Sequence, residues 1–348
     1  MPLTHTEYGV HTEAATAAAA FASQIKGKII LITGVNSKGI GGETALALAA
    51  YEPKLLIAAG RTSTKVEEAL KPIKDQHPGT PCKIVTLDLS SQKSCREAAK
   101  EILDSADVPQ IDIVINNAGI MWLPERRLSP EGIELQFATN HIGHYLFTNL
   151  IMPKIIALAK ASPKGGTRIV NVSSRGVVYS PIRFSDWNHT KTFEELPESE
   201  RPPIEVVTEF HGGKVGAYTP IVAYGQSKTA NVLFSVQLNK SLYDAYGILS
   251  IALHPGHVMT ELGRYIPPEE MALVAERARS SGIELKSPSE GASTQIVAAL
   301  DPNLGPEDFF LAECRPGDWL PKWGSDPTSA EKLWKLSESL VGEEFQWP

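Results

Sequence analysis

The sequence predicts an α/β fold built on one doubly wound parallel sheet, and three observations support this. Apolar, β-branched runs alternate with helix-like stretches along most of the chain. These runs are almost continuously apolar, as expected for strands that are buried on both faces. A glycine-rich turn follows the first run directly and leads into a helix. Such alternation places ligands at the carboxyl ends of the strands.

The predicted elements follow in chain order. A short amphipathic helix over residues 14–24 precedes the sheet. Strands are predicted over residues 28–33, 54–60, 82–89, 111–119, 168–174 and 249–256. Helices are predicted over residues 41–52, 63–76, 91–106, 131–161 and 223–246, then a last strand within 308–313 and a last helix over 328–340. Pro153 predicts a kink or break in its helix, because proline lacks the backbone donor.

One domain accommodates all of these elements. Residues 1–26 are predicted to be an N-terminal extension and residues 27–262 the Rossmann unit. Residues 263–348 are predicted to form a C-terminal substrate lobe, with the last strand and helix of the same domain. Residues 175–222 form an insertion that is too long for a simple connection. Its polar, proline-rich composition predicts a flap on the substrate side rather than core.

Composition narrows the class of partner and the compartment. The chain has 348 residues, with 33 Lys and Arg against 40 Asp and Glu, a net charge of −7. It therefore has no general attraction for nucleic acid. The sequence contains no window of ~18 uninterrupted apolar residues, so no membrane span is expected. The N-terminal alanine run lacks the basic segment that precedes the apolar region of a signal peptide, so no signal peptide is expected. Three cysteines without a CxxC pair predict reduced thiols and a cytoplasmic location.

The glycine-rich turn reads "GVNSKGIGG". Gly34 would turn the chain off the first strand. Gly39 and Gly41 would let the backbone approach a diphosphate and let the next helix pack closely on the sheet. The N-terminus of that helix directs its N–H groups and its positive dipole end at the phosphates. The turn therefore predicts a dinucleotide cofactor.

Two cations favour NADP(H) over NAD(H). Arg61 follows Gly41 by 20 residues and ends the second strand, in "AAGRT". An acidic residue at this position recognises the ribose 2′-hydroxyl, whereas an arginine suits a 2′-phosphate. Lys38 places a second cation in the turn. The alternative is that both are solvated surface charges.

Tyr224 and Lys228 in "YGQSK" are four residues apart and share one face of a helix. Hydride arriving at a carbonyl carbon leaves negative charge on the oxygen, so the site must supply a proton and donors. Lowering the pKa of tyrosine by about 2 units requires ~2.7 kcal/mol. An ammonium at ~4 Å supplies about 4 kcal/mol at an effective dielectric constant of ~20. One lysine is therefore sufficient in principle to make Tyr224 a base near neutral pH.

Histidine pairs do not predict a metal site. His141 and His144 lie three residues apart on one helix, and His254 and His257 bracket a turn. No third ligand follows either pair at the spacing of a zinc site. No metal is therefore expected.

The motifs together resemble the short-chain dehydrogenase/reductase family. "TGVNSKGIG", "NNAG", "VSS", "YGQSK" and "PGHVMT" occur in the family's order, over roughly residues 25–260. "TNHIGHYLFTNL", "FSDWN" and "SKTANVLF" look most like the branch that contains retinol dehydrogenases and the WW-domain oxidoreductase. Two departures stand out. Four residues instead of three separate the first two glycines of the turn, and Tyr224 follows Ser174 by 50 residues.

The resemblance implies a role for each matching residue. Tyr224 would be the general acid or base, Lys228 its electrostatic partner, Ser174 the anchor of the carbonyl oxygen and Asn140 a relay residue. Adjacent Ser173 could be confused with Ser174. The resemblance also implies the cofactor-binding residues. Gly34, Lys38, Gly39, Ile40 and Gly41 would form the cofactor loop, Arg61 the 2′-phosphate position, Asp88 and Leu89 the adenine site, and Asn117, Ala118 and Gly119 the ribose site. Pro255, Gly256, Val258 and Thr260 would form the loop at the nicotinamide carboxamide, and Tyr224 and Lys228 would also contact the cofactor.

The expected function is an NADP(H)-dependent oxidoreductase that interconverts a ketone or aldehyde and an alcohol. Its partner would be a small carbonyl compound or alcohol, and a homodimer is left open. A carbon–carbon double-bond reductase on the same scaffold is one alternative. A non-catalytic NADPH sensor is another, although a sensor would not need the complete catalytic set. The sequence does not specify the substrate, because specificity lies in loops and a shared fold does not tell which substrate these loops bind.

Overall fold

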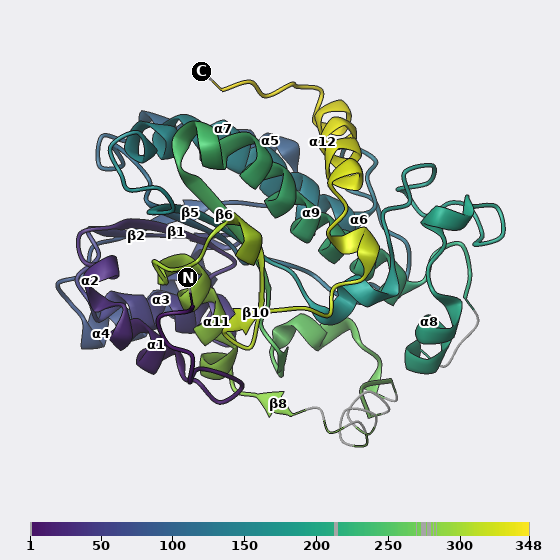
Figure 1. The fold of residues 1–348 in the computed structure, drawn as a ribbon, viewed down its shortest axis with the longest axis horizontal. Coiled ribbons are helices and arrows are strands. Elements are labelled where there is room, and N and C mark those ends of the chain that lie inside the picture. Colours follow the sequence, from purple (N-terminus) through teal and green to yellow (C-terminus); the bar gives the residue numbers. More distant parts are fainter. Residues whose placement is uncertain are drawn as a thin grey trace.

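The computed structural model describes residues 2–211, 215–268, 270–272, 276, 280, 282 and 284–347. Its main sheet has eight strands: β1 (Ile29–Thr33), β2 (Leu55–Gly60), β3 (Cys82–Thr86), β4 (Ile113–Asn116), β5 (Thr167–Val172), β6 (Ile248–His254), β9 (Phe310–Ala312) and β10 (Arg315–Pro316). The strand order is β10-β9-β6-β5-β4-β1-β2-β3. All neighbours are parallel except β10, which runs antiparallel to β9. The predicted doubly wound α/β sheet, the Rossmann fold, is confirmed (Figure 1).

Helices cover both faces of the sheet (Figure 1). One layer contains α1 (Ala14–Ala20), α2 (Ala22–Ile25), α3 (Ile40–Ala49), α4 (Ser63–Gln76) and α11 (Pro288–Leu300). The other contains α5 (Gln92–Asp104), α7 (Gly143–Ala159), α9 (Pro220–Tyr246) and α12 (Pro327–Val341). Every residue of β1, β4, β5 and β6 is buried between these layers. Burial on both faces explains why these strands lack polar alternation.

The strand order reverses between β1 and β4, which are neighbours in register at Ile32 and Ile115. The chain leaves β1 for β2 on one side and later enters β4 on the other. Connections from the two strands therefore diverge at their carboxyl ends. Open α/β sheets bind ligands at such a reversal. The glycine turn after β1 and residues 117–119 after β4 meet at this point.

Of the predicted kink or break at Pro153, the break is wrong, and the kink stays a prediction. The helical region consists of α6 (Leu135–Phe137), a π-helical segment η1 (Ala138–Ile142) and α7, which continues through Pro153. Pro153 is exposed, while the residues around it on α7 are buried in the core, so apolar packing compensates for the missing backbone bond. Among the described residues, 135–159 form the one helix that is long and apolar enough to cross a membrane, and 72% of its apolar window is buried inside the protein.

The described residues after 262 continue the sheet domain, and the predicted substrate lobe stays a prediction. After η4 (Glu261–Tyr265), β8 (Leu285–Lys286) pairs with β7 (His257–Val258), and β9 extends the main sheet beside β6. The last helix, α12, packs on α9 and α7, with the Trp334 ring 4.9 Å from that of Tyr145. The sequence of residues 263–300 also predicts two helical stretches: helix α11 lies in this range, and much of the part between 269 and 283 lies outside the described residues.

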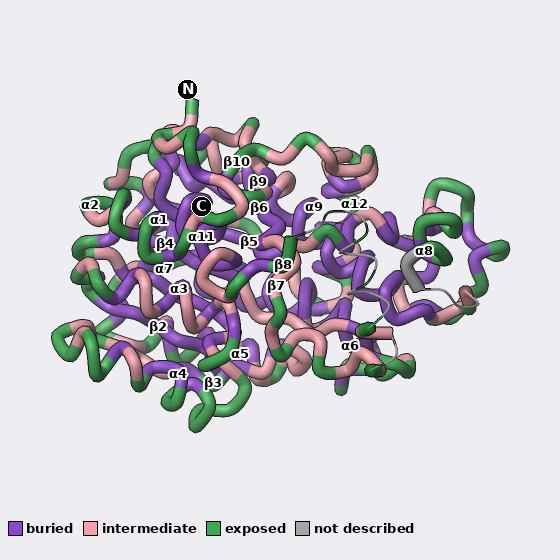
Figure 2. Tube along the Cα trace, turned by 90° about the horizontal axis from the view of Figure 1, so that it is seen from below, coloured by how far each residue is buried: buried purple, intermediate pink, exposed green. Residues whose placement is uncertain are grey.

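The insertion has a small apolar core, although its composition is polar. It contains η2 (Arg175–Tyr179), η3 (Glu198–Glu200) and α8 (Ile204–His211) and projects from the sheet domain (Figure 1). Phe193, Leu196 and Val207 are buried in one apolar cluster with Trp122 and Tyr224. Buried segments accordingly run into the projection around α8 (Figure 2). The predicted flap is therefore packed against the residues beside Tyr224.

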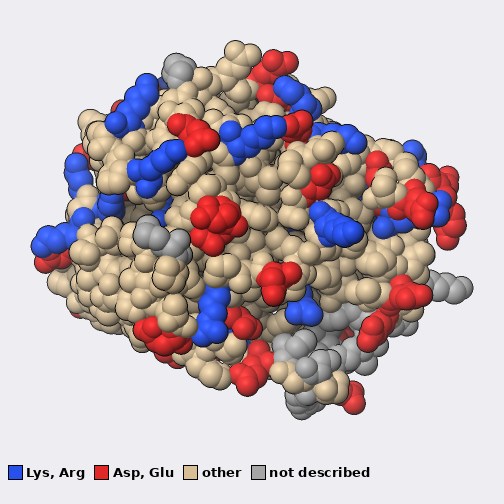
Figure 3. Space-filling view, viewed as in Figure 1, with Lys and Arg blue, Asp and Glu red and all other residues tan. Residues whose placement is uncertain are grey.

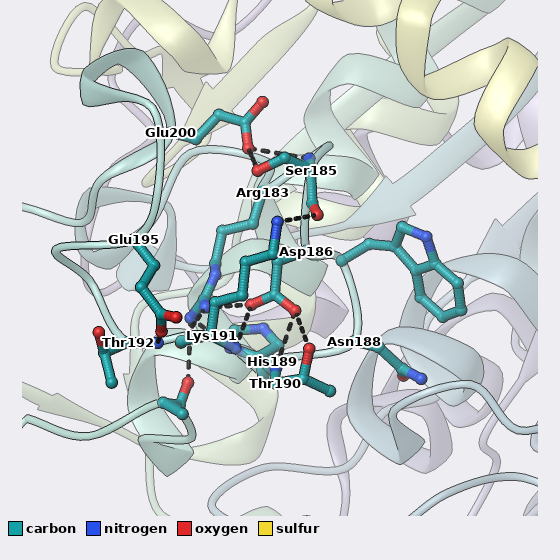
Figure 4. A network of polar contacts seen from close by, with 12 residues as sticks. Arg183, Ser185, Asp186, Asn188, His189, Thr190, Lys191, Thr192, Glu195 and Glu200 are labelled. Atoms are coloured by element: carbon teal, nitrogen blue, oxygen red, sulfur yellow. Dashed lines mark hydrogen bonds and ion pairs between the residues drawn. The ribbon is translucent and has the colours of Figure 1, made fainter.

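A buried ion pair anchors the base of the insertion. The Arg183 guanidinium pairs with Asp186, and both side chains are almost completely buried. Arg183 also donates to the Lys191 carbonyl at 2.8 Å and to His189 Nδ1 at 3.0 Å. Asp186 accepts the Thr190 backbone N–H at 2.8 Å and hydroxyl at 2.6 Å. Asp186 and His189 accordingly both face Arg183 (Figure 4).

Helix α9 holds this anchor from the other side. Gln226 Oε1 accepts the backbone N–H of Arg183 at 3.0 Å, and Gln226 Nε2 donates to the Trp187 carbonyl at 3.0 Å. Gln226 lies two residues after Tyr224 on the same helix. The insertion is therefore tied to the helix that carries the predicted catalytic tyrosine.

The surface charges are mixed. Acidic and basic side chains are interspersed on the face shown in Figure 3, without a large patch of one sign. This pattern accords with the modest net charge of −7.

Candidate active site

Glycines bring the ends of β1 and β4 close together. Gly34 has a φ of +73°, and a Cβ added there would lie 2.6 Å from Ala118 Cα. A Cβ on Gly41 would lie 2.5 Å from Asn117 Nδ2. Helix α3 begins at Ile40 with Gly39 as a cap that offers no side chain. The first N–H groups of α3 therefore remain available for an anion, which fits a dinucleotide diphosphate.

Residues 117–119 connect this turn to the predicted catalytic residues. The Asn117 and Ala118 N–H groups both donate to Thr33 Oγ1 at 3.0 Å. A Cβ on Gly119 would lie 3.3 Å from Asn140 Oδ1 and 3.5 Å from Lys228 Nζ. The predicted ribose segment thus lies against two of the predicted catalytic side chains.

Asn140 lies in the π-helical segment η1 and is fully buried. Its Oδ1 accepts the Ile120 N–H at 2.8 Å. Its Nδ2 donates to the Ile120 carbonyl at 2.9 Å and to Ser227 Oγ at 2.9 Å. All side-chain bonds of Asn140 are therefore made within the protein, and they fix the loop after β4 against α9.

Ser174 and Tyr224 meet at the start of the insertion. Ser174 Oγ accepts the Gly176 N–H at 3.1 Å and hydrogen-bonds the Tyr224 side chain. A Cβ on Gly176 would lie 2.9 Å from Tyr224 Cε1, so the ring needs a glycine there. Adjacent Ser173 is different, because its hydroxyl donates to the Lys228 carbonyl at 2.7 Å. Ser174, not Ser173, is thus the serine beside the phenol.

Burial sets the acidity of the tyrosine and the lysine. It raises the pKa of Tyr224 to about 12, and the hydrogen bond from Ser174 only partly opposes this. Burial also lowers the pKa of Lys228 to about 7. Lys228 Nζ donates to the Val172 carbonyl at 2.9 Å and lies 5.7 Å from the centre of the Tyr224 ring. Burial of Tyr224 therefore opposes the lowering of its pKa that the Lys228 charge was expected to produce.

The buried ammonium has a consequence for stability. The pKa of Lys228 falls from 10.5 to about 7 on folding, so the unfolded chain binds more protons between these values. The penalty is therefore full below pH 7 and fades as pH rises toward 10.5. We expect Lys228→Met to raise the free energy of unfolding of the free protein at pH 6 by roughly 2 kcal/mol or more.

Denaturant unfolding at pH 6 and pH 9 measures this effect. The advantage of Lys228→Met over the parent should shrink between the two pH values. A variant that is equally destabilised at both would show that the ammonium stabilises the fold.

The residues predicted around the adenosine end differ in exposure. Lys38 and Arg61 are exposed, and neither forms an ion pair within the described part of the chain. Asp88 Oδ1 accepts the Ser90 hydroxyl at 2.7 Å. The Leu89 side chain is buried in the core, where a Cβ on Gly143 would lie 2.2 Å from the Leu89 carbonyl oxygen. Leu89 therefore has only its backbone to offer a ligand.

The predicted carboxamide loop packs against helix α11. Pro255 is buried, and Gly256 has a φ of +94°. A Cβ added at Gly291 would lie 2.6 Å from Val258 Cγ2 and 3.3 Å from Ile40 Cδ1, so the loop and the glycine turn both contact α11. Thr260 caps η4 by accepting the Leu262 N–H at 3.3 Å.

Comparison with known proteins identifies the chain. The family model described as short chain dehydrogenase matches residues 28–193. Mouse retinol dehydrogenase 14 is 33% identical over 329 residues, covering 91% of this chain and 86% of that protein. An oxidoreductase from Fusarium equiseti is 36% identical over 245 residues, 70% of this chain and 93% of the other. The chain belongs to the short-chain dehydrogenase/reductase family.

Within this family, the chain lies in the retinol dehydrogenase-like branch. A solved protein from Mycobacterium paratuberculosis shares the fold, with a TM-score of 0.65 and 27% identity over 93% of this chain and 96% of the other. An NADPH-bound carbonyl reductase from chicken fatty liver has a TM-score of 0.56 and 20% identity over 84% of this chain and all of its own, which shows the fold alone. The family uses NAD(P)(H) and catalyses dehydrogenase or reductase chemistry.

Several residues of this short-chain dehydrogenase/reductase site were missed from the sequence. A Cβ on Gly42 would lie 2.3 Å from the Asn36 carbonyl oxygen, so the fourth glycine of "GVNSKGIGG" is needed as well. Gln295 on α11 donates to Asn117 Oδ1 at 2.9 Å. The aliphatic part of Lys286 packs on Gly256, 2.4 Å from where a Cβ would be. The Gly-Gly pair was a visible signal for Gly42, whereas Gln295 and Lys286 meet the site only through tertiary folding.

Proposed function

We propose that this chain is an NADP(H)-dependent enzyme that interconverts a ketone or aldehyde and an alcohol, with Tyr224 as the general acid or base. One observation carries the proposal. A buried, protonated phenol contacts Ser174 and lies beside Lys228, at the sheet edge where the glycine turn and residues 117–119 converge.

Each of the three side chains has its own role in the proposed carbonyl reduction. When bound, NADPH supplies the hydride. Tyr224 donates its proton to the carbonyl oxygen, and the Ser174 hydroxyl donates a hydrogen bond to the same oxygen. Lys228, protonated, stabilises the phenolate that remains. Oxidation of the alcohol uses the same groups in reverse. Burial raises the pKa of Tyr224, so the phenol is protonated at neutral pH and has a proton to donate in reduction.

The surroundings of Tyr224 favour an apolar substrate. Its ring belongs to a buried cluster with Trp122, Tyr179 and Phe193, and Ile266 packs against this cluster. Trp122 adopts a φ of +62°, in the left-handed region that costs a bulky residue energy. Packing by the insertion holds it there. Apolar side chains exclude water from the carbonyl, which strengthens the interactions of the proton donor.

Arg61 supports the choice of NADP(H), because its exposed guanidinium forms no ion pair with any residue that the structure describes. A charge-assisted bond to a 2′-phosphate contributes about 1.5–3 kcal/mol. We therefore expect Arg61→Asp to weaken NADPH binding tenfold or more, where ~1.4 kcal/mol is a factor of ten, and to spare NADH. Fluorescence titration with both cofactors measures the ratio of the two dissociation constants.

Lys71→Asp is the matched control, because Lys71 is exposed on α4 and the charge change is identical. It should shift the two dissociation constants equally and slightly. An unchanged NADPH-to-NADH ratio in Arg61→Asp would contradict the assignment of the 2′-phosphate site.

A further inference from the structure

Buried hydrogen bonds link the end of β4 to the π-helical segment that carries Asn140. The link passes through His144 and Thr33, which are 2% and 0% exposed. His144 Nδ1 lies 3.0 Å from the Asn140 carbonyl oxygen, and His144 Nε2 lies 2.8 Å from Thr33 Oγ1. Thr33 Oγ1 in turn accepts the Asn117 and Ala118 N–H groups at 3.0 Å. His144 therefore stands between the two predicted halves of the site.

The partners fix the direction of every bond. The Asn140 carbonyl oxygen can only accept, so His144 Nδ1 must carry the hydrogen. In a neutral imidazole Nε2 is then an acceptor, and the Thr33 hydroxyl must donate to it. Both lone pairs of Thr33 Oγ1 are occupied by the two backbone N–H groups. One tautomer of His144 and one rotamer of the Thr33 hydroxyl satisfy the whole arrangement.

The electrostatic setting keeps the imidazole neutral. Burial lowers the pKa of His144 to about 4; the hydrogen bond to the Asn140 carbonyl opposes this change, and the nearby Lys228 charge adds to it. His144 consequently holds one hydrogen and one lone pair throughout the neutral range. It therefore makes the same two hydrogen bonds across this range and does not titrate.

The Asn140 carbonyl connects His144 to the predicted catalytic segment. The side chain of Asn140 is bound to Ile120 and Ser227, and its carbonyl to His144, so the residue is held from two sides. Its segment is π-helical, and π-helical turns replace the ordinary α-helical bonds and often occur at functional sites. A side-chain donor at this carbonyl therefore acts where the regular helix pattern is interrupted.

We propose that His144 is a positioning residue of the active site. Its imidazole, oriented by Thr33, holds the Asn140 carbonyl and so fixes the catalytic segment against the cofactor-binding segment 117–119. The proposal rests on the proposed function only in the roles of these two segments. A purely structural histidine would support the fold without coupling them.

Matched variants separate coupling from packing. His144→Phe keeps a ring but removes both hydrogen bonds, and Thr33→Val keeps the shape of threonine without its hydroxyl, whereas Thr33→Ser keeps the hydroxyl. His141→Phe is the control, because His141 is a buried neighbour of Asn140 whose Nε2 contacts Ser337 on α12. His141→Phe should change stability but not NADP⁺ affinity or kcat.

The decisive experiment is a double-mutant cycle of Thr33→Val and His144→Phe, read in NADP⁺ dissociation constants and in kcat. We expect each single change to lower kcat roughly 10- to 100-fold, and to weaken NADP⁺ binding measurably. The double variant should be no worse than the worse single one, because either change breaks the same link. Thr33→Ser should retain most of the parent values. Additive effects in both readouts, or a His141→Phe variant with the same loss, would overturn the proposal.

The tautomer provides a test that needs neither turnover nor folded variants. In ¹⁵N-labelled parent protein, His144 should show the Nδ1–H form and should not titrate down to about pH 5. An Nε2–H form, or a His144 that titrates near neutral pH, would overturn the proposal whatever the protein catalyses. If the tautomer and the NADP⁺ cycle hold while no carbonyl compound turns over, the proposed function fails and the link stands.

Discussion

Tyr224→Phe is expected to lower kcat by roughly 10²–10⁴-fold while leaving cofactor affinity almost unchanged. The change removes one hydroxyl and keeps the ring that packs beside Gly176 and Trp122. If the phenol delivers the proton, the variant loses stabilisation of the transition state but not of the ground state. Single-turnover reduction combined with NADPH titration separates the two quantities.

Tyr243→Phe is the control for this substitution, since it makes the same chemical change near the other end of α9. It should retain the parent kcat. A Tyr224→Phe protein that turns over at the parent rate would eliminate the proposed acid, even if the fold and the cofactor assignment remain correct.

Asp186→Ala is expected to destabilise the protein by about 3–5 kcal/mol, because it leaves the buried Arg183 guanidinium without its counter-charge. The side chains of the pair are 0% and 2% exposed. Burial raises the pKa of Asp186, but hydrogen bonds from Thr190 and Lys191 and the Arg183 charge outweigh it, so the net pKa is lowered. The carboxylate is thus charged at neutral pH. Urea unfolding measures the loss.

The exposed pair of Lys164 and Asp244 provides the comparison. Asp244→Ala breaks an ion pair of 2.7 Å at a side chain that is 94% exposed, so it should cost about 0–1 kcal/mol. The double variant Arg183→Met/Asp186→Leu should recover part of the loss, because no uncompensated charge remains. If Asp186→Ala lowers the free energy of unfolding as little as Asp244→Ala does, the Arg183 guanidinium becomes hydrated in the variant without destabilising the domain, and the expectation is wrong.

The strands were predictable from the sequence because the sheet is buried on both faces. Short, continuous apolar runs such as residues 28–33 are typical of strands that are buried on both faces. The predicted ends were less accurate: β3 stops at Thr86 and β4 at Asn116, where the chain leaves the sheet to form the site. Pro153 was misjudged because one missing donor on an exposed helix face costs less than the packing of α7 contributes.

The proximity of several predicted site residues could be predicted from the sequence, but their electrostatics could not. Spacing indicated Tyr224 and Lys228, and the family resemblance added Ser174; the fold places the three side chains together. The pKa values depend on burial, which no local spacing reveals, so the sequence argument left out the burial that raises the pKa of Tyr224. The anchor of the insertion was also hidden, because Arg183 and Asp186 look like ordinary surface charges in a polar stretch.

The most direct test of the account is a turnover screen of the parent protein with NADPH and a panel of apolar ketones and aldehydes. Oxidation of NADPH is followed by absorbance, and the organic product is identified. The account predicts one alcohol formed per NADPH oxidised, with NADH much less effective. Tight NADPH binding without turnover of any carbonyl compound, or reduction of an enone only at its carbon–carbon double bond, would contradict it.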